Sequence, residues 1–514
     1  MHIGIDVGGT NTDAVLVDGR TVRGWAKTPT TRDVGSGIVT VLRRLLKESG
    51  VTTRDIKATM IGTTHFTNAV VERRRLLEVA AVRLALPAAR CLPPMTDWPG
   101  DLADTLGRHT YMAKGGNEFD GRAISELDEA EIRLIGTDIR NKGLKVAAVT
   151  AVFSPVTRDM EIHAAEILRS EVPGLQVSLS HEIGRIGLLE RENATIVNAS
   201  LIELAHRVVS SFRNSLIELQ IDAPFFISQN DGTLMAPDFV EKYPVLTFAS
   251  GPTNSMRGAA LLAGIKDAMV VDIGGTTTDV GMLMHGFPRE SPVSVEIGGV
   301  RTNFRMPDLL SIGLGGGSLV RDEGARIGPD SVGYELTEKA LVFGGDVLTT
   351  TDIVVAAGLQ DIGDRSRVAH LSPALVSRTL DTIHSMIDAA VDRMKTSADP
   401  LPVVLVGGGS ILISRELPSA SQVLKPQNAS VANAIGAAIA QVGGETDRIF
   451  TLEGTTRDAV ISMAKGLAID KAIAAGALPA SVGVIDIEEV PLAYLPGNAV
   501  RVRAKAVGDL KDFS

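Results

Sequence analysis

Two short segments of the chain share a carboxylate, adjacent glycines and hydroxyl side chains in the same order. Residues 6–13 read Asp-Val-Gly-Gly-Thr-Asn-Thr-Asp, residues 272–279 read Asp-Ile-Gly-Gly-Thr-Thr-Thr-Asp, and the two match at six of eight positions. Adjacent glycines let a ligand approach the backbone, while turn N–H groups and threonine hydroxyls donate to phosphate oxygens. A carboxylate beside them can hold Mg²⁺ or its water molecules against phosphate. A single copy would be an ordinary hairpin turn, but the doubled segment predicts a site for a nucleotide and Mg²⁺.

Two further glycine-rich loops are expected to complete this site. Residues 402–410 (Pro-Val-Val-Leu-Val-Gly-Gly-Gly-Ser) combine a buried strand with a bare loop that suits the flat approach of a purine and ribose. Residues 311–318 (Ser-Ile-Gly-Leu-Gly-Gly-Gly-Ser) are either a flexible turn or, as we expect, a close approach to phosphate or to the second hairpin, since four glycines cost backbone entropy. The expected nucleotide contacts are Gly8, Gly9, Thr10, Asn11, Thr12, Gly274, Gly275, Thr276, Thr277, Gly315, Gly316, Gly407, Gly408, Gly409 and Ser410.

Both carboxylate segments lie between short apolar runs, which predicts that each is the tip of a β-hairpin. Residues 3–6 and 269–272 have the pattern of buried strands, and residues 14–17 and 280–284 that of their antiparallel returns. The other expected elements are helices at 38–48, 158–172, 188–219, 430–440 and 457–475, strands at 145–150, 175–179, 482–487 and 499–504, and a loop-rich insert at 87–121 over the cleft.

The length of the chain predicts more than one domain. A chain of 514 residues is too long for a single compact core. We expect an N-terminal lobe at 1–187, a second lobe with the second phosphate loop and the adenosine loop at 188–445, and a small C-terminal α/β unit at 446–514.

The order of first phosphate loop, second phosphate loop, adenosine loop and small-residue helix resembles the actin, hexokinase and heat-shock chaperone ATPase superfamily. Within it, the chain resembles the hydantoinase A and oxoprolinase family. The closer resemblance rests on residues 6–13, 61–73, 249–252, 272–279 and 311–318. The superfamily implies an α/β fold in which two ribonuclease-H-like lobes clamp ATP, with Mg²⁺ near the first strands. The family implies ATP-dependent opening of a cyclic amide or a related carboxylation, usually shared with a B-type subunit.

This resemblance implies roles for the two carboxylates that end the first strands. Asp6 and Asp272 would both lie near Mg²⁺, and Asp272 would orient or deprotonate the nucleophile, because the equivalent aspartate lies beside the γ-phosphate in related folds. A cyclic amide is resonance-stabilised, and transfer of the γ-phosphoryl group to its oxygen would create a better leaving group. Hydrolysis of the activated intermediate is expected from a B-type hydantoinase subunit or another hydrolase. We therefore expect an oligomer.

Three other functions stay open. The ATP-activating subunit of a related carboxylase would look alike in its ATP half. A small-molecule kinase would use the same ATP clamp, but residues 61–73 and 311–318 disfavour it. A non-catalytic ATP switch of the activator type often carries an iron–sulfur cluster, which the single Cys91 cannot build. The chain ends at Ser514 and lacks the longer Gly- and Pro-rich continuation after Ser318 that the family leads us to expect, so the substrate stays open.

Three ionisable residues outside these loops have two interpretations each. His65 stands where the family often has an aliphatic residue, and a change in packing is favoured over a substrate contact. His181 and Glu182, with the charged residues at 190–193, are interpreted as a solvated helix face with ion pairs rather than a cleft-facing cluster. The nine histidines form no His-x-x-x-His pair, and Gly-Lys-Ser and Gly-Lys-Thr are absent from the sequence. A zinc site and a P-loop are therefore not expected.

The composition narrows the partners and the location. The net charge of −10 is spread along the chain without a basic stripe, which argues against a nucleic-acid partner. One cysteine excludes an internal disulfide and a cysteine-cluster metal site. No apolar run reaches membrane length, and no charged, apolar and cleavable segment precedes Ile3. We therefore expect a cytoplasmic enzyme without a membrane partner.

Overall fold

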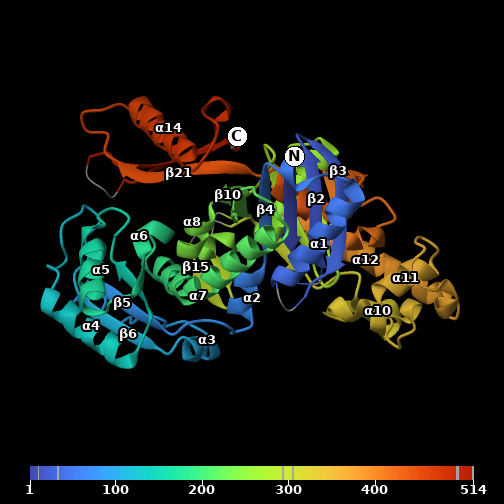
Figure 1. Cartoon of the computed structure of the whole chain (residues 1–514), viewed down its shortest axis with the longest axis horizontal. Coiled ribbons are helices and arrows are strands. Elements are labelled where there is room, and N and C mark those ends of the chain that lie inside the picture. The colour runs from blue at the N-terminus through green and yellow to red at the C-terminus, as the bar shows by residue number, and fades with distance from the viewer. Residues whose placement is uncertain (10, 32–33, 292–293, 304–305, 494–496, 512–514) are drawn as a thin grey trace.

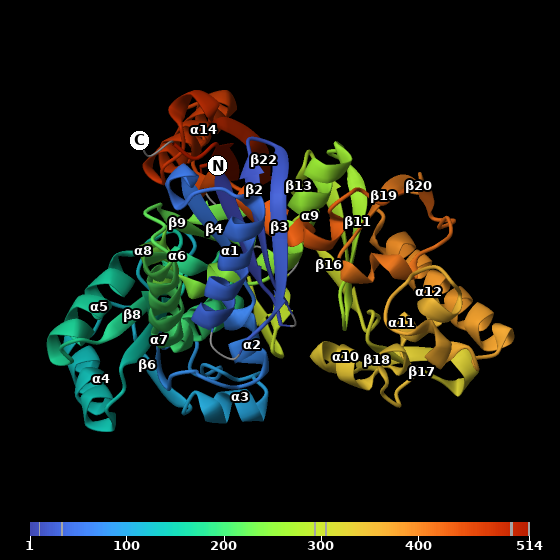
Figure 2. The ribbon, with the colours of Figure 1, turned by 45° about the vertical axis from the view of Figure 1, so that its right-hand side comes forward.

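The chain folds into two bodies, each built on a mixed β-sheet that contains one of the predicted hairpins (Figure 1). The computed structural model describes residues 1–9, 11–31, 34–291, 294–303, 306–493 and 497–511. The first body holds a nine-stranded sheet and a four-stranded sheet, and the second holds a six-stranded sheet. Figure 2 shows the two bodies side by side.

The nine-stranded sheet is built outward from the first hairpin. Ile3 pairs with Leu16 and Ile5 with Ala14, and all four side chains are fully buried. α1 (Val34–Ser49) and α13 (Ala432–Ala438) cover opposite faces, which explains why this hairpin is apolar rather than alternating. The strands in spatial order are β22 (Gly483–Pro491), β23 (Val500–Gly508), β21 (Gln441–Phe450), β10 (Thr233–Met235), β9 (Phe225–Ser228), β4 (Ala58–Thr63), β1 (His2–Val7), β2 (Asn11–Asp18) and β3 (Thr21–Pro29).

A four-stranded parallel sheet completes the first body. In spatial order it contains β6 (His109–Lys114), β5 (Val79–Leu86), β7 (Val146–Ala151) and β8 (Gln176–Leu179). Alternate residues of β5 face opposite sides: Ala80 and Val82 contact the layer of α4 (Glu129–Lys142) and α5 (Asp159–Glu171), whereas Val79 and Ala81 contact α7 (Leu188–Glu218). α7 also packs against α1 and so joins the two sheets of the first body.

The second body is built on the second hairpin. Its sheet has the order β13 (Phe287–Pro288), β12 (Thr278–Met284), β11 (Ala268–Ile273), β19 (Leu401–Val406) and β20 (Ala420–Leu424), and β16 (Leu309–Ile312) also pairs with β12. α12 (Pro373–Met394) buries Ile383 and Ile387 against this sheet. The remaining elements of this body are β17 (Ser318–Arg321), β18 (Arg326–Ser331), α9 (Ser250–Ala263), α10 (Leu336–Lys339) and α11 (Thr350–Ala356).

The C-terminal elements extend the first sheet. β23 pairs with β21 and β22, and α14 (Arg457–Ala474) buries Ala464, Ala468 and Ala472 against them. The nine-stranded sheet thus contains strands from all three of the predicted ranges 1–187, 188–445 and 446–514. The division of the chain into these three domains stays a prediction. The remaining elements of the first body are α2 (His65–Val71), α3 (Gly100–Thr105), α6 (Ser180–Ile183), α8 (Pro237–Lys242) and the hairpin β14 (Val295–Ile297) and β15 (Val300–Thr302).

The prediction of a loop-rich insert at 87–121 is wrong at two places. α3 and β6 both form inside it, and β6 pairs in parallel with β5 at the edge of the four-stranded sheet. The prolines and paired glycines of the insert dominate its sequence pattern, whereas the six residues of β6 acquire their structure from the neighbouring strand. Within the described ranges, no helix is long and apolar enough to cross a membrane.

Candidate nucleotide site

The first hairpin places Asp6 near the end of β1, beside the hairpin tip. Asp6 lies opposite Asp13 on β2 and, across the parallel pair with β4, beside Gly62. The Gly8 N–H closes the tip by donating to the Asn11 carbonyl at 3.0 Å. Among the residues predicted to contact a nucleotide here, the structure places Gly8, Gly9, Asn11 and Thr12 at the tip, and Thr10 lies outside the described residues.

The second hairpin repeats this arrangement. Asp272 lies opposite Asp279, and the Gly274 N–H donates to the Thr277 carbonyl at 2.9 Å. The predicted contacts Gly274, Gly275, Thr276 and Thr277 form this tip. Both hairpins therefore hold a carboxylate at the same position relative to a glycine tip, as the doubled sequence predicts.

The loop after β16 lies directly on the second tip. The Gly316 N–H donates to the Gly274 carbonyl at 3.0 Å, and the Gly317 N–H donates to the Gly275 carbonyl at 2.7 Å. A Cβ atom at Gly315 would lie 2.6 Å from the carbonyl carbon of Gly275, which no side chain could tolerate. The glycines of this loop therefore serve close contact with the second hairpin, and their contact with a nucleotide stays a prediction.

The loop after β19 also approaches the second hairpin closely. At Gly407, where φ is +81°, a Cβ atom would overlap with the Asp272 carboxylate and the Ile273 carbonyl oxygen. A Cβ atom at Gly409 would lie 2.7 Å from the Gly274 carbonyl oxygen. Gly407, Gly408, Gly409 and Ser410 thus run past the base of the second tip, with Gly408 open on its Cβ side.

Asp6 is in an environment that disfavours its charge. Its side chain is buried, and burial together with repulsion from Asp13 and Asp272 raises the pKa of Asp6 to about 8. Lys27, which pairs with Asp13 at 3.0 Å, and a hydrogen bond from Asn433 act in the opposite direction. The Asp272 carboxylate of the second hairpin thus acts electrostatically on Asp6 of the first. At neutral pH Asp6 therefore carries a proton unless a cation compensates its charge.

Asp272 is perturbed in the same direction but less strongly. Burial raises the pKa of Asp272 to about 6, repulsion from Asp279 adds to this, and a hydrogen bond with Ser255 opposes it. Asp272 is therefore mostly ionised at neutral pH and can accept a proton in that range. Two carboxyl groups with different pKa values in one site suit one to bind a cation and the other to act as a base.

Two asparagines that we did not predict flank Asp6. Asn433 on α13 donates through Nδ2 to one oxygen of Asp6 at 2.6 Å. The other oxygen of Asp6 is buried, as are both polar atoms of the Asn254 side chain on α9, and none of the three has a hydrogen-bond partner within the described structure. A Cβ atom at Gly62 would lie 2.6 Å from Asn254 Nδ2 and 2.9 Å from Asp6 Oδ1, so these polar atoms meet around Gly62. In the sequence, Asn254 and Asn433 each lie within a helix of mostly small side chains. That position was the available sign that they face another element.

The donor set around Asp6 fits a hard cation of the Mg²⁺ type. A carboxylate oxygen and an amide oxygen without partners are the ligands that Mg²⁺ and its water molecules take. Among the described residues, no group of three or more His, Cys, Asp or Glu side chains is placed to hold a metal ion. Mg²⁺ is usually held by one or two carboxylates, with water and phosphate oxygens as the other ligands. Direct coordination by Asp6 and Asp272 stays a prediction.

Two helices connect this site to both bodies. α9 and α13 cross in backbone contact, because a Cβ atom at Gly258 would overlap with the Ala432 carbonyl oxygen and one at Gly436 with the Asn254 carbonyl oxygen. α13 packs on β1 and β2 of the first body, and α9 packs on β11 and β19 of the second. Asn254 and Asn433 therefore lie where a relative movement of the two bodies would be transmitted to Asp6.

The three other ionisable residues have structural partners. His65 begins α2 beside the first tip, its Nδ1 lies 2.7 Å from Thr63 Oγ1, and burial lowers the pKa of His65 to about 4. His181 Nδ1 lies 2.7 Å from the buried carboxylate of Glu161, and Glu182 pairs with Lys242 at 3.1 Å. These contacts lie near the end of the four-stranded sheet. The prediction of a solvated helix face is wrong for the charged residues at 190–193, because Arg191 and Glu192 are buried and Glu192 pairs with Arg83 of β5. With its pKa lowered, His65 is neutral at physiological pH and lies close to the first tip.

Family models match two thirds of the chain. The hydantoinase/oxoprolinase N-terminal region matches residues 2–172, and the hydantoinase/oxoprolinase model matches residues 191–362. The chain therefore belongs to the hydantoinase/oxoprolinase family, as the resemblance of its motifs indicated.

Curated relatives include enzyme subunits of two kinds. The chain is 26% identical over 380 residues to the caprolactamase subunit alpha of Pseudomonas jessenii, covering 70% of this chain and 54% of that protein. It is 25% identical over 400 residues to the acetophenone carboxylase gamma subunit of Aromatoleum aromaticum, covering 69% of this chain and 53% of that protein. The chain thus spans about half the length of these relatives.

Solved structures confirm the fold class. The crystal structure of the ATP-dependent caprolactamase from Pseudomonas jessenii matches 99% of this chain and 88% of its own chain with a TM-score of 0.80 at 21% identity. Nucleotide-free acetone carboxylase matches 100% of this chain and 88% of its own chain with a TM-score of 0.69 at 16% identity. The protein has the α/β fold of the actin-like ATPases, with its two hairpin-bearing lobes.

Proposed function

We propose that this chain is the ATP-activating subunit of an enzyme that opens a cyclic amide. The observation that carries the proposal is the pair of hairpins, each with an aspartate beside a glycine tip, in which the charge of Asp272 acts on the buried Asp6. Two such tips offer backbone N–H groups to phosphate from opposite sides. The similarity to a caprolactamase subunit supports the choice of a lactam as the substrate class.

Each part of the site has a proposed role. The first and second tips hold the β- and γ-phosphates of ATP, and the loop at 407–410 lies against the adenosine. Asp6, with Asn254 and Asn433 beside it, holds Mg²⁺ or its water ligands. Mg²⁺, when bound, would neutralise the phosphate oxygens and draw Asp6 into its ionised form. Asp272 positions the substrate amide and accepts its N–H proton, which makes the amide oxygen a better nucleophile.

The proposed reaction has three steps. The amide oxygen attacks the γ-phosphorus, the bond between the β- and γ-phosphoryl groups breaks, and ADP leaves with the electron pair. A first water adds to the activated carbon, and the ring nitrogen leaves as an amine after taking a proton. A second water cleaves the resulting acyl phosphate into carboxylate and inorganic phosphate. The products are an amino acid, ADP and phosphate.

A carboxylase is the second candidate. The identity to the acetophenone carboxylase gamma subunit is 25%, against 26% to the caprolactamase subunit, over a similar share of the chain. In that case the same ATP half would phosphorylate a different oxygen nucleophile. Assays for ring-opened lactam and for bicarbonate-dependent ADP formation separate the two candidates.

The isolated chain is expected to be an incomplete enzyme. Both subunit relatives are named as parts of larger assemblies, so we propose a B-type hydantoinase or other hydrolase partner, bound through an interface of more than about 1,200 Å². Purified alone, the chain should open lactams poorly, and ADP coupled to product should form when the partner is added. Both are measured in one sample by chromatography. Equal amounts of ADP and ring-opened product from the chain alone, at about ten per second, would show that no partner is needed.

A further inference from the structure

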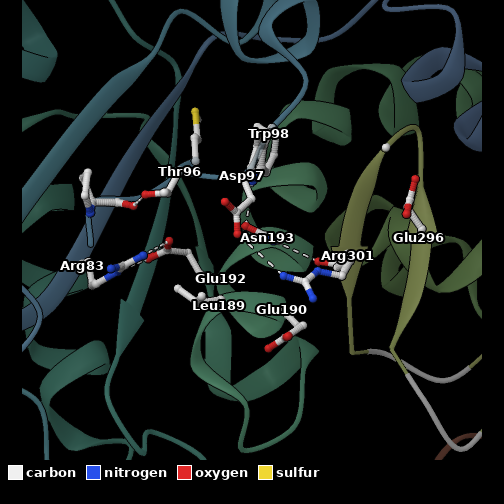
Figure 3. Close-up of a pocket in the computed structure, with 13 residues that line it drawn as sticks. Arg83, Thr96, Asp97, Trp98, Leu189, Glu190, Glu192, Asn193, Glu296 and Arg301 are labelled. Carbon is white, nitrogen blue, oxygen red and sulfur yellow. Dashed lines mark hydrogen bonds and ion pairs between the residues drawn. The ribbon is translucent and has the colours of Figure 1, made fainter. Parts of the chain in front are cut away.

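A second pocket lies in the first body, away from the two hairpin tips. It has a volume of about 200 Å³ and is enclosed by the segment after β5, the first turns of α7 and the hairpin β14–β15 (Figure 3). None of the residues of the two tips or of the glycine-rich loops lines it. A cavity of this volume has room for several water molecules. It therefore suits a small molecule of a few carbons.

The pocket has a rigid, neutral floor. Arg83 on β5 is fully buried and donates through Nε to Glu192 at 2.7 Å and through Nη2 to the other oxygen of Glu192 at 2.5 Å. Arg83 also donates to the Leu92 carbonyl oxygen. Arg83 and Glu192 neutralise each other through their two hydrogen bonds, so neither side chain is available to bind a ligand. Because removing either partner would leave a buried charge, the pair fixes the shape of the floor.

A chain of hydrogen bonds ties the three walls together. The indole N–H of Trp98 donates to the side-chain oxygen of Asn193 at 2.8 Å. The side-chain nitrogen of Asn193 donates to the Arg301 carbonyl at 2.9 Å. The segment after β5, α7 and β15 are thus held in fixed positions, and the pocket is preformed. A preformed pocket binds a small ligand without the cost of ordering its walls.

The ionisable side chains of the walls are not matched to one another. Arg301 pairs with Asp97 at 3.6 Å, but the two side chains are 58% and 70% exposed, so this ion pair is weak. Glu190 and Glu296 also line the pocket, and within the described residues neither has a hydrogen-bond or ion-pair partner. The pocket therefore offers an exchangeable guanidinium group and two free carboxylates.

We propose that this pocket binds a small zwitterionic amino acid. The ammonium group would bind Glu190 and Glu296, and the carboxylate would bind the planar fork of Arg301 in place of Asp97. A ligand with only one of these charges would leave either Arg301 or the two glutamates without a partner of opposite charge. The choice of an amino acid rests on the proposed function, since opening a lactam produces an amine and a carboxylate on one molecule. The pocket would then sense or hold the product apart from the site of phosphoryl transfer.

Calorimetric titration of the full chain with 6-aminohexanoate tests this assignment. We expect saturable binding at one site, with hexanoate and hexylamine each at least tenfold weaker, because each satisfies only one kind of charge. Arg301→Gln and Glu190→Gln should each lower the affinity for 6-aminohexanoate at least tenfold. Asp97→Asn should raise the affinity for 6-aminohexanoate, because the substitution removes the carboxylate that competes for Arg301. Arg23→Gln, which alters an equally exposed arginine paired with Asp18, is the matched control and should have no effect.

Two results would overturn the assignment. One is binding of hexanoate as tight as that of 6-aminohexanoate, which would define a simple anion site. The other is no binding of 6-aminohexanoate, or binding unchanged in Arg301→Gln. The same samples are titrated with Mg²⁺ and a non-hydrolysable ATP analogue. If the ATP analogue binds and 6-aminohexanoate does not, only the proposed amino-acid pocket is refuted. If 6-aminohexanoate binds in a way that depends on Arg301 and the ATP analogue does not bind, the proposed function is refuted and the pocket assignment is kept.

Discussion

Replacing Asp272 with asparagine is expected to lower the turnover of ATP by at least about a hundredfold, comparable to the loss of one preorganised electrostatic group in an active site. The asparagine side chain would keep the size of the aspartate and the contact with Gly407 but could not accept a proton. The pKa of Asp272, raised to about 6 by burial, suits it to that step near neutral pH. The measurement is steady-state ADP formation by the assembled enzyme, and kcat should fall more than the affinity for ATP.

The matched control for this substitution is Asp267→Asn. Asp267 precedes the same strand, β11, but is exposed and accepts a hydrogen bond from the His285 N–H at 2.9 Å, which asparagine can also accept. We expect wild-type turnover from this variant. Turnover within a few-fold of wild type in Asp272→Asn would remove Asp272 from the chemical step.

Replacing Asp6 with asparagine is expected to stabilise the protein above neutral pH when no nucleotide or metal is bound. The pKa of Asp6 is raised from 3.8 to about 8 by burial and by two neighbouring carboxylates. Between these values the folded state keeps a proton that the unfolded state has lost, so stability falls as the pH rises from about 4 to about 8. At about 1.4 kcal/mol per pKa unit, the loss approaches a ceiling of about 6 kcal/mol. Asp6→Asn removes this loss.

Urea unfolding at pH 5, 6, 7 and 8 in the presence of a chelator measures the effect. The stability of Asp6→Asn relative to wild type should increase by at least about 2 kcal/mol between pH 5 and pH 8. Asp18→Asn, on the same hairpin but exposed and paired with Arg23, should follow the wild type. Parallel curves for Asp6→Asn and wild type across this range would mean that Asp6 is already ionised without a cation.

The fold of both hairpins could be predicted from local sequence. The apolar runs at 3–6 and 269–272, the glycine tips and the returning strands are all contiguous, and the structure pairs Asp6 with Asp13 and Asp272 with Asp279 in the same register. The long helix expected at 188–219 forms as α7 over Leu188–Glu218. In these segments periodicity and turn chemistry favour the same structure as the tertiary packing.

The parts that sequence could not predict depend on contacts between distant segments. Asn433 reaches Asp6 across 427 residues of chain, and Asn254 meets it only because α9 and α13 cross in backbone contact. The pairing of β21 with β10 and β23, which brings the C-terminal strands into the first sheet, has no local pattern of its own. The second pocket draws on three separate segments, and Glu192 has the pattern of an ordinary helix surface until Arg83 is placed beneath it.

Calorimetric titration of the chain with a non-hydrolysable ATP analogue, with and without Mg²⁺, tests the central claim most directly. If the two hairpins and the loop at 407–410 form one nucleotide site, the analogue should bind at one site per chain in the presence of Mg²⁺ and much more weakly when the metal is chelated. The double variant Asp6→Asn, Asp272→Asn should lose this dependence on the metal. Absence of binding by the wild-type chain with Mg²⁺ present would contradict the account.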